Sequence, residues 1–129
     1  MAVVTIRDFF SRLGRSPEEV RGENLCDWVE SLKPVGVIPI EEVVPRQQVK
    51  VAGVIQNIRI HPSEGTGTIE ATIIDGTGEL IAKWLGRSSM PGIRLGMGLI
   101  LEGTGGVGKD GYLVILNPDF SLVPGPEHG

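Results

Sequence analysis

Two runs of alternating apolar residues dominate the chain, and both lie between Thr68 and Leu85. The apolar positions of the two runs are Ile69/Ala71/Ile73 and Leu80/Ala82/Trp84. Between the runs stands Asp75-Gly76-Thr77-Gly78, which supplies the flexible residues that a tight reversal of the chain needs. Because a period of two is typical of strands with one buried face, residues 68–85 are predicted to form a β-hairpin.

The other positions of this hairpin share the opposite face, because successive side chains of a strand point to opposite sides. They are Glu70, Thr72, Ile74, Ile81, Lys83 and Leu85. A function carried by the hairpin is expected on this face. Trp84 has the inward parity and is interpreted as a core residue. Stacking of Trp84 on a ligand is the alternative, since a local bulge would reverse its direction.

Alternation also marks a long strand that starts at Gln47 or Gln48. Val49, Val51, Gly53 and Ile55 share one parity, and the apolar positions then shift to Ile58 and Ile60. This shift predicts a β-bulge, and Gly53 allows the strand to bend far enough to belong to two sheets. We further expect a loop over 61–67, at most one helical turn over 86–93, a strand over 99–103, a glycine-rich turn over 104–111 and a strand over 112–116 that residues 117–123 extend or follow.

Helical spacing replaces alternation in the first part of the chain. A short helix is predicted over residues 4–13, and Ser16, Pro17 and Glu19 form the start of a second helix that Pro34 ends. Gly22 is a position where this second helix would break into two pieces. Its apolar stripe consists of Leu25, Trp28, Val29 and Leu32. The stripe either packs on the β part as a cover or docks a partner, including a second copy of the chain. Residues 35–44 are interpreted as a connector with room for a short edge strand at its end.

The 129 residues, 40% of them hydrophobic, suffice for one domain with a real core. We expect a helical extension and connector over 1–45, the β domain over 46–123 and a disordered tail over 124–129. The single cysteine, Cys26, excludes an internal disulfide framework and a cysteine-based zinc cluster. Arg7 and Asp8 interrupt the early apolar residues, which argues against a secretory signal, and no apolar run is long enough to span a bilayer. We therefore expect a cytoplasmic protein without membrane contacts.

The formal net charge of −4 argues against a protein that coats nucleic acid, because such proteins carry a clear basic excess. The charge is unevenly distributed. Residues 1–45 carry five basic and eight acidic side chains, whereas residues 46–124 carry seven of each. The β part is therefore neutral, which leaves room for a basic stripe on one of its faces.

The order of these elements resembles an OB-fold barrel, a partly open five-stranded barrel that binds oligonucleotides on the face of its second and third strands. The resemblance covers residues 46–123 and is carried by VKVAGVIQNI, IIDGTGELIAKWLGR, MPGIRLGMGLILEG and NPDF. These segments look like the small stand-alone OB-fold nucleic-acid-binding proteins of actinobacteria. They are more distantly similar to the wedge domain of branch-migrating DNA helicases and to the anticodon-binding domains of some aminoacyl-tRNA synthetases. The implied fold is an all-β core, a five-stranded OB-fold barrel with an N-terminal α-helical extension.

The resemblance implies nucleic-acid contacts from the exposed side of the third strand, at Ile81, Lys83 and Leu85, with Arg87 just beyond. In replication protein A-like domains an aromatic residue of this strand stacks on a base, and Leu85 occupies that position here. Because a stacking residue contributes roughly 1–3 kcal/mol per base, its absence predicts weak binding. The complete candidate set for nucleic-acid binding is Lys83, Arg87, Arg94, Arg59, Lys50, Leu85 and Tyr112. The alternatives are that the basic residues are ordinary solvated charges and that Tyr112, like Phe120, is a residue of the barrel.

Catalysis finds little support in the sequence. His61 and His128 are the only histidines, and no spacing of nucleophile, base and orienting group is visible. Asp75 and Glu79 flank the hairpin turn, where aspartate favours turn geometry. The glycines of residues 103–111 lack the Lys-Ser/Thr ending of a phosphate loop, and we interpret them as a mobile hairpin loop over a bound strand.

The sequence therefore predicts no catalytic, metal or cofactor site. It predicts a non-enzymatic module that binds single-stranded DNA more readily than RNA, with low sequence preference and modest affinity. The alternative is a protein–protein interaction module whose barrel or helical extension docks into a complex.

Overall fold

The first strand, β1 (Gln48–Pro62), belongs to two parts of the sheet in the computed structural model, which describes residues 17–62, 67–87 and 89–126. Residues 48–54 of β1 pair with β4 (Gly98–Val107), and the part from Val54 onward pairs with β2 (Gly67–Ile74). The register shifts between Ile55 and Asn57, which confirms the predicted bulge. A Cβ at Gly53 would lie 2.5 Å from Ile73 Cγ2 and 2.6 Å from the Ile74 carbonyl oxygen. Glycine is therefore required where β1 bends across β2.

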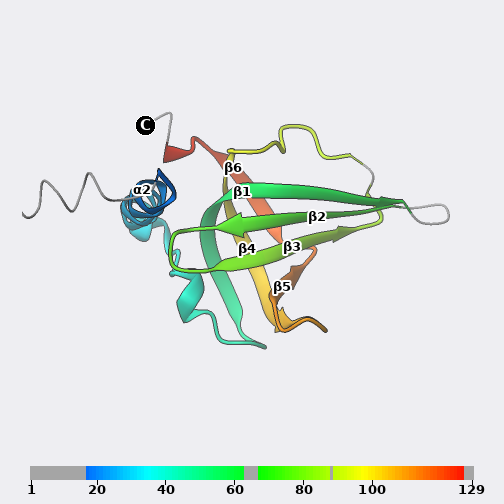
Figure 1. The fold of residues 1–129 in the computed structure, drawn as a ribbon. Helices are drawn as coiled ribbons and strands as arrows, with labels where there is room; N and C mark the ends of the chain where they lie inside the picture. The colour runs from blue at the N-terminus through cyan, green and yellow to red at the C-terminus, as the bar shows by residue number, and fades with distance from the viewer. Residues whose placement is uncertain (1–16, 63–66, 88, 127–129) are drawn as a thin grey trace, which may run out of the picture.

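Five strands close into a ring in the order β1-β2-β3-β5-β4, with β4 returning to β1 (Figure 1). The remaining strands are β3 (Glu79–Leu85), β5 (Leu113–Leu116) and β6 (Asp119–Val123). The β3–β5 pair is parallel, and the other pairs are antiparallel. This topology confirms the predicted OB-type barrel. Residues 119–123 do not extend β5 but form a sixth strand, because they turn back and pair with the first half of β4.

The β2–β3 hairpin has the predicted turn and the predicted faces. Its inward pairs join Ile69 to Trp84, Ala71 to Ala82 and Ile73 to Leu80, and these residues are at most 3% exposed. Trp84 is a core residue, because its Nε1 donates a hydrogen bond to the Pro118 carbonyl oxygen at 3.1 Å and its ring meets the edge of Phe120 with centroids 5.5 Å apart. The outward face of the hairpin is thus free for another role.

The N-terminal helix α2 (Pro17–Ser31) continues through Gly22 and lies beside the barrel (Figure 1). Val29 of this helix packs with Val37 and Ala52 in a small second core, with Trp28 at its margin. Trp28 Nε1 also donates a hydrogen bond to the Pro124 carbonyl oxygen at 3.0 Å. The apolar stripe therefore packs on the barrel as a cover. The predicted helix over 4–13 lies outside the described residues. Among the described helices, none is long and apolar enough to cross a membrane.

Three expected segments differ from the structure. The turn predicted over 104–111 is wrong in its first half, because β4 continues to Val107 and pairs with β5 there. The connector contains two 3-10 helices, η1 (Lys33–Val35) and η2 (Ile40–Glu42), in place of an edge strand. The first residues of the expected loose tail are packed, since Pro124 accepts the Trp28 hydrogen bond and Gly125 is buried. The end of β4, η2 and the first residues of the tail each contact a segment that is distant in the sequence.

Candidate nucleic-acid-binding groove

The turn of the β2–β3 hairpin is fixed by one buried carboxylate, Asp75, which is 0% exposed. Its Oδ1 accepts hydrogen bonds from the Thr77 N–H at 2.8 Å, the Thr77 hydroxyl at 2.7 Å and the Gly78 N–H at 3.1 Å. Its Oδ2 accepts one from the Ile40 N–H at 2.8 Å. Asp75 therefore shapes the turn, as predicted, and also ties the hairpin to η2.

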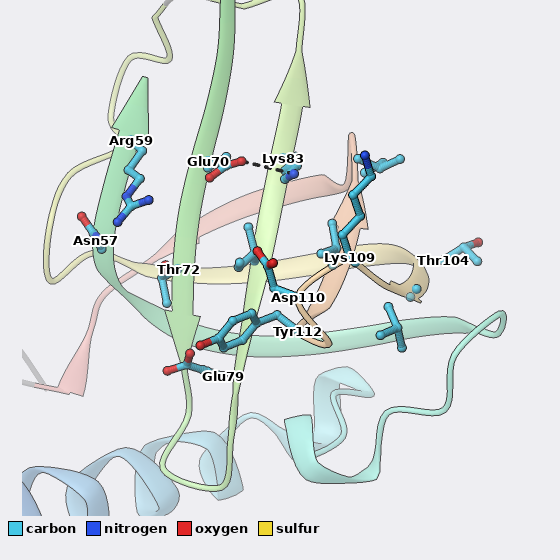
Figure 2. A pocket seen from close by; sticks show the side chains of 17 residues that line it. Asn57, Arg59, Glu70, Thr72, Glu79, Lys83, Thr104, Lys109, Asp110 and Tyr112 are labelled. Atoms are coloured by element: carbon cyan, nitrogen blue, oxygen red, sulfur yellow. Dashed lines mark ion pairs between the residues drawn. The ribbon is translucent and has the colours of Figure 1, made fainter. Parts of the chain in front are cut away.

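The outward face of this hairpin forms one wall of an open groove with a volume of about 980 Å³ (Figure 2). The opposite wall is made by the end of β4, the turn that follows it and β5. The groove is lined by residues of β1, the hairpin and this opposite wall: Asn57, Arg59, Glu70, Thr72, Glu79, Ile81, Lys83, Thr104, Gly105, Gly106, Val107, Gly108, Lys109, Asp110, Tyr112, Val114 and Leu116. Segments that lie far apart in the sequence meet here because the ring of strands is closed.

A row of charged residues crosses the hairpin wall of the groove. In the strand register Glu70 lies opposite Arg59 of β1 on one side and opposite Lys83 of β3 on the other. Glu70 Oε1 is 3.2 Å from Lys83 Nζ, and Glu70 Oε2 is 3.3 Å from His61 Nε2. Burial alone raises the pKa of the Glu70 carboxyl, but the hydrogen bonds and charges of Lys83 and His61 outweigh it, so this pKa lies below its ordinary value.

The groove as a whole carries balanced charge. Arg59, Lys83 and Lys109 supply three positive charges, and the acidic residues Glu70, Glu79 and Asp110 supply three negative ones. Lys109 lies on the turn between β4 and β5, and Figure 2 shows it on the side of the groove opposite Arg59. Sequence reasoning did not select Lys109, because its position across from the hairpin follows only from ring closure.

The opposite wall is largely apolar and unusually exposed. Val107 is 58% exposed, Tyr112 49% and Leu116 57%. Ile81 of the hairpin and Val114 of β5, which are partners in the β3–β5 pair, join the two walls and are half-buried. The hairpin wall therefore offers charges, and the opposite wall adds an aromatic ring with aliphatic neighbours to the charges of Lys109 and Asp110.

Of the seven predicted site residues, the structure brings Arg59, Lys83 and Tyr112 together in this groove. The other four are not among its lining residues. Leu85 follows Lys83 on the same face of β3 and is 51% exposed, and Arg87 is exposed just beyond that strand. Arg94 is exposed in the connection between β3 and β4. Lys50 lies in the half of β1 that pairs with β4, opposite Glu102.

Comparisons with known proteins identify the fold and no closer relationship. No family model matches the chain, and no curated protein matches it. Among solved structures, the chain is similar to RecG bound to a three-way DNA junction, with a TM-score of 0.54 and 15% sequence identity. That match covers 70% of this chain and 13% of the RecG chain. The chain also aligns with a replication protein A heterotrimer bound to single-stranded DNA, with a TM-score of 0.46 and 20% identity, over 59% of this chain and 57% of the other.

Proposed function

We propose that this protein is a non-enzymatic module that binds single-stranded nucleic acid, DNA more readily than RNA, with low sequence preference and modest affinity. The observation that carries the proposal is the groove, which places Arg59, Lys83 and Lys109 around an apolar wall that includes Tyr112. Basic side chains match phosphates, and aromatic or aliphatic surfaces match the faces of bases. RecG, which shares the fold, was determined in complex with a DNA junction, and this supports DNA as the ligand class.

The same groove supports a single strand and little discrimination between bases. The exposed ring of Tyr112 can stack only on a base that is not enclosed in a duplex, and stacking tolerates every base because each has a π-face. The affinity is modest because the acidic residues of the groove balance its basic residues and because Lys83 is already paired with Glu70. Leu85, on the same face of β3 as Lys83, is aliphatic and offers no ring on which a base could stack.

A protein partner is the second candidate ligand. The exposed aliphatic side chains of Val107 and Leu116 favour it, since contiguous exposed apolar surface often marks a protein contact. The dependence of binding on salt separates the two candidates, because phosphate contacts release counterions and aliphatic contacts do not.

The test is a fluorescence anisotropy titration with labelled single strands of about 16 nucleotides, which covers the site sizes of OB domains. Two or three phosphate contacts predict a slope of log K against log[salt] between about −1.4 and −2.1. Affinity should therefore fall by about 25- to 125-fold between about 20 mM and about 200 mM salt. Absence of binding at the lower salt, or an affinity that does not respond to salt, would refute the proposal.

Single substitutions test the position of the site. Tyr112→Ala should weaken binding by about 5- to 150-fold, which corresponds to the loss of one stacked base. Arg59→Ala should reduce the salt slope by about 0.7. Lys50→Ala removes a basic residue of the same strand that lies outside the groove, and it should leave both the affinity and the slope unchanged. Equal losses in the Arg59 and Lys50 variants would show that binding does not depend on the groove.

A further inference from the structure

A carboxylate lies at the centre of the positive charges of the groove. Each carboxylate oxygen of Glu70 lies near a different basic side chain, with Oε1 3.2 Å from Lys83 Nζ and Oε2 3.3 Å from His61 Nε2. The Glu70 side chain is 20% exposed, so its carboxylate is largely covered, whereas the Lys83 side chain is 34% exposed and partly open to solvent. Arg59 lies opposite Glu70 in the register of β1 and β2.

This arrangement resembles the surroundings of a bound phosphate. Phosphate oxygens, like carboxylate oxygens, accept charge-assisted hydrogen bonds from lysine and protonated histidine. Lys83 cannot direct its full charge at a phosphate while Glu70 holds its ammonium group. A nucleic-acid strand that enters the groove must therefore displace Glu70 or share Lys83 with it.

We propose that Glu70 occupies an anion position of the groove and limits its affinity for single-stranded nucleic acid by holding Lys83 and His61. This inference rests on the proposed function and deepens it, because it names the residue that sets the strength of binding. The other charged residues of the groove sharpen the expectation. With Glu70 the six charges of the lining sum to zero, and without it they sum to one positive charge with Lys83 released.

The variant Glu70→Gln tests the inference, because it keeps the size of the side chain and removes its charge. One additional phosphate contact steepens the salt slope for a single strand by about 0.7. This predicts that Glu70→Gln binds the labelled oligonucleotide about eightfold more tightly than the unaltered protein at about 50 mM salt and about threefold more tightly at about 200 mM. Circular dichroism and the melting temperature of each variant report whether the barrel is retained.

Two controls distinguish release of Lys83 from a general gain of positive charge. Glu102→Gln removes the same charge from an exposed position of β4 outside the groove, opposite Lys50, and should change affinity by less than about twofold because distant surface charges are screened. In the double variant Glu70→Gln/Lys83→Ala the gain should disappear. Equal effects of Glu70→Gln and Glu102→Gln would overturn the inference.

Weaker binding by Glu70→Gln would also overturn it, because Glu70 would then contact the ligand directly. If the unaltered protein binds and Glu70→Gln binds no more tightly, the inference about Glu70 fails and the proposed function stands. If neither protein binds at about 20 mM salt, both fail.

Discussion

Replacing Asp75 by asparagine is expected to weaken the contact between the hairpin turn and η2. Asparagine has the same shape, but it carries one acceptor oxygen and one donor amide where the carboxylate has two acceptors. If the asparagine oxygen takes the place of Oδ1 and keeps its three donors, the side-chain NH2 group takes the place of Oδ2. It then faces the N–H of Ile40, whose nitrogen is 2.8 Å from Oδ2 in the unaltered protein. Ile40 is 1% exposed, so this N–H finds no water to replace the lost acceptor.

The cost follows from these contacts. An unsatisfied buried donor destabilises a protein by about 1–3 kcal/mol, and the three remaining hydrogen bonds weaken because they lose their ionised acceptor. The desolvation of a fully buried carboxylate acts in the opposite direction, since asparagine does not incur it. With four donors around two oxygens, we expect the hydrogen bonds to outweigh desolvation. The net loss in the free energy of unfolding is about 3 kcal/mol, or about 10 °C in melting temperature for a domain of this size.

Urea unfolding followed by tryptophan fluorescence measures this loss. Asp110→Asn makes the same chemical change at an exposed position of the β4–β5 turn and should alter stability by less than about 0.5 kcal/mol. A second substitution, Thr77→Val, removes one of the donors to Asp75, so its effect should be smaller in the Asp75→Asn background. If Asp75→Asn is as stable as the unaltered protein, the cost of burying the charge cancels the hydrogen bonds and the reasoning is refuted.

Two further predictions concern the strands that build the groove. Gly53→Ala should lower the free energy of unfolding by at least about 1–3 kcal/mol, because the alanine Cβ would lie 2.6 Å from a backbone oxygen of β2. A variant that resists urea as well as the unaltered protein would contradict this close approach of β1 and β2. The pKa of Glu70 is lower in the folded protein than its ordinary value of 4.5. Ionised Glu70 therefore stabilises the fold at pH values above 4.5, and this stabilisation is lost as the pH falls through the lower pKa of the folded state. The difference in unfolding free energy between the unaltered protein and Glu70→Gln should therefore be present at neutral pH and shrink on acidification below about pH 4.5; a constant difference would show that Glu70 titrates normally.

Most of the barrel could be predicted because its information is local. The alternation on both sides of Asp75 determined the hairpin, its faces and the inward position of Trp84, since a one-residue slip would expose the whole apolar set. The parity shift after Ile55 located the bulge in the same way. These signals repeat every second residue and need no knowledge of the rest of the chain.

The extent of β4 could not be predicted by the same reasoning. Glycines at 105 and 106 indicate a turn when only their own segment is considered. In the closed ring they do the opposite, because they pair with Ile115 and Val114 of β5. A Cβ at the neighbouring Gly103 would lie 2.7 Å from Ile115 Cγ2 and keep β5 away from β4. Only the position of β5 explains why these residues belong to a strand.

The groove, too, could be predicted only in part from the sequence, and this part matters more for function. The outward face of the hairpin, with Lys83, was predictable from alternation, whereas the opposite wall with Lys109 and Tyr112 depends on where ring closure places the β4–β5 turn. The sequence nevertheless contained the more general constraint, since residues 46–124 carry as many acidic as basic side chains. The groove reproduces that balance with three acidic and three basic side chains, and Glu70 forms an ion pair with one of the basic ones, Lys83. Because counterion release scales with the number of phosphates neutralised, a groove in which Glu70 already holds Lys83 gains less from its charges than one whose basic side chains are all unpaired. On the proposed function, its affinity for a single strand then depends on Tyr112 and on how readily Glu70 yields Lys83.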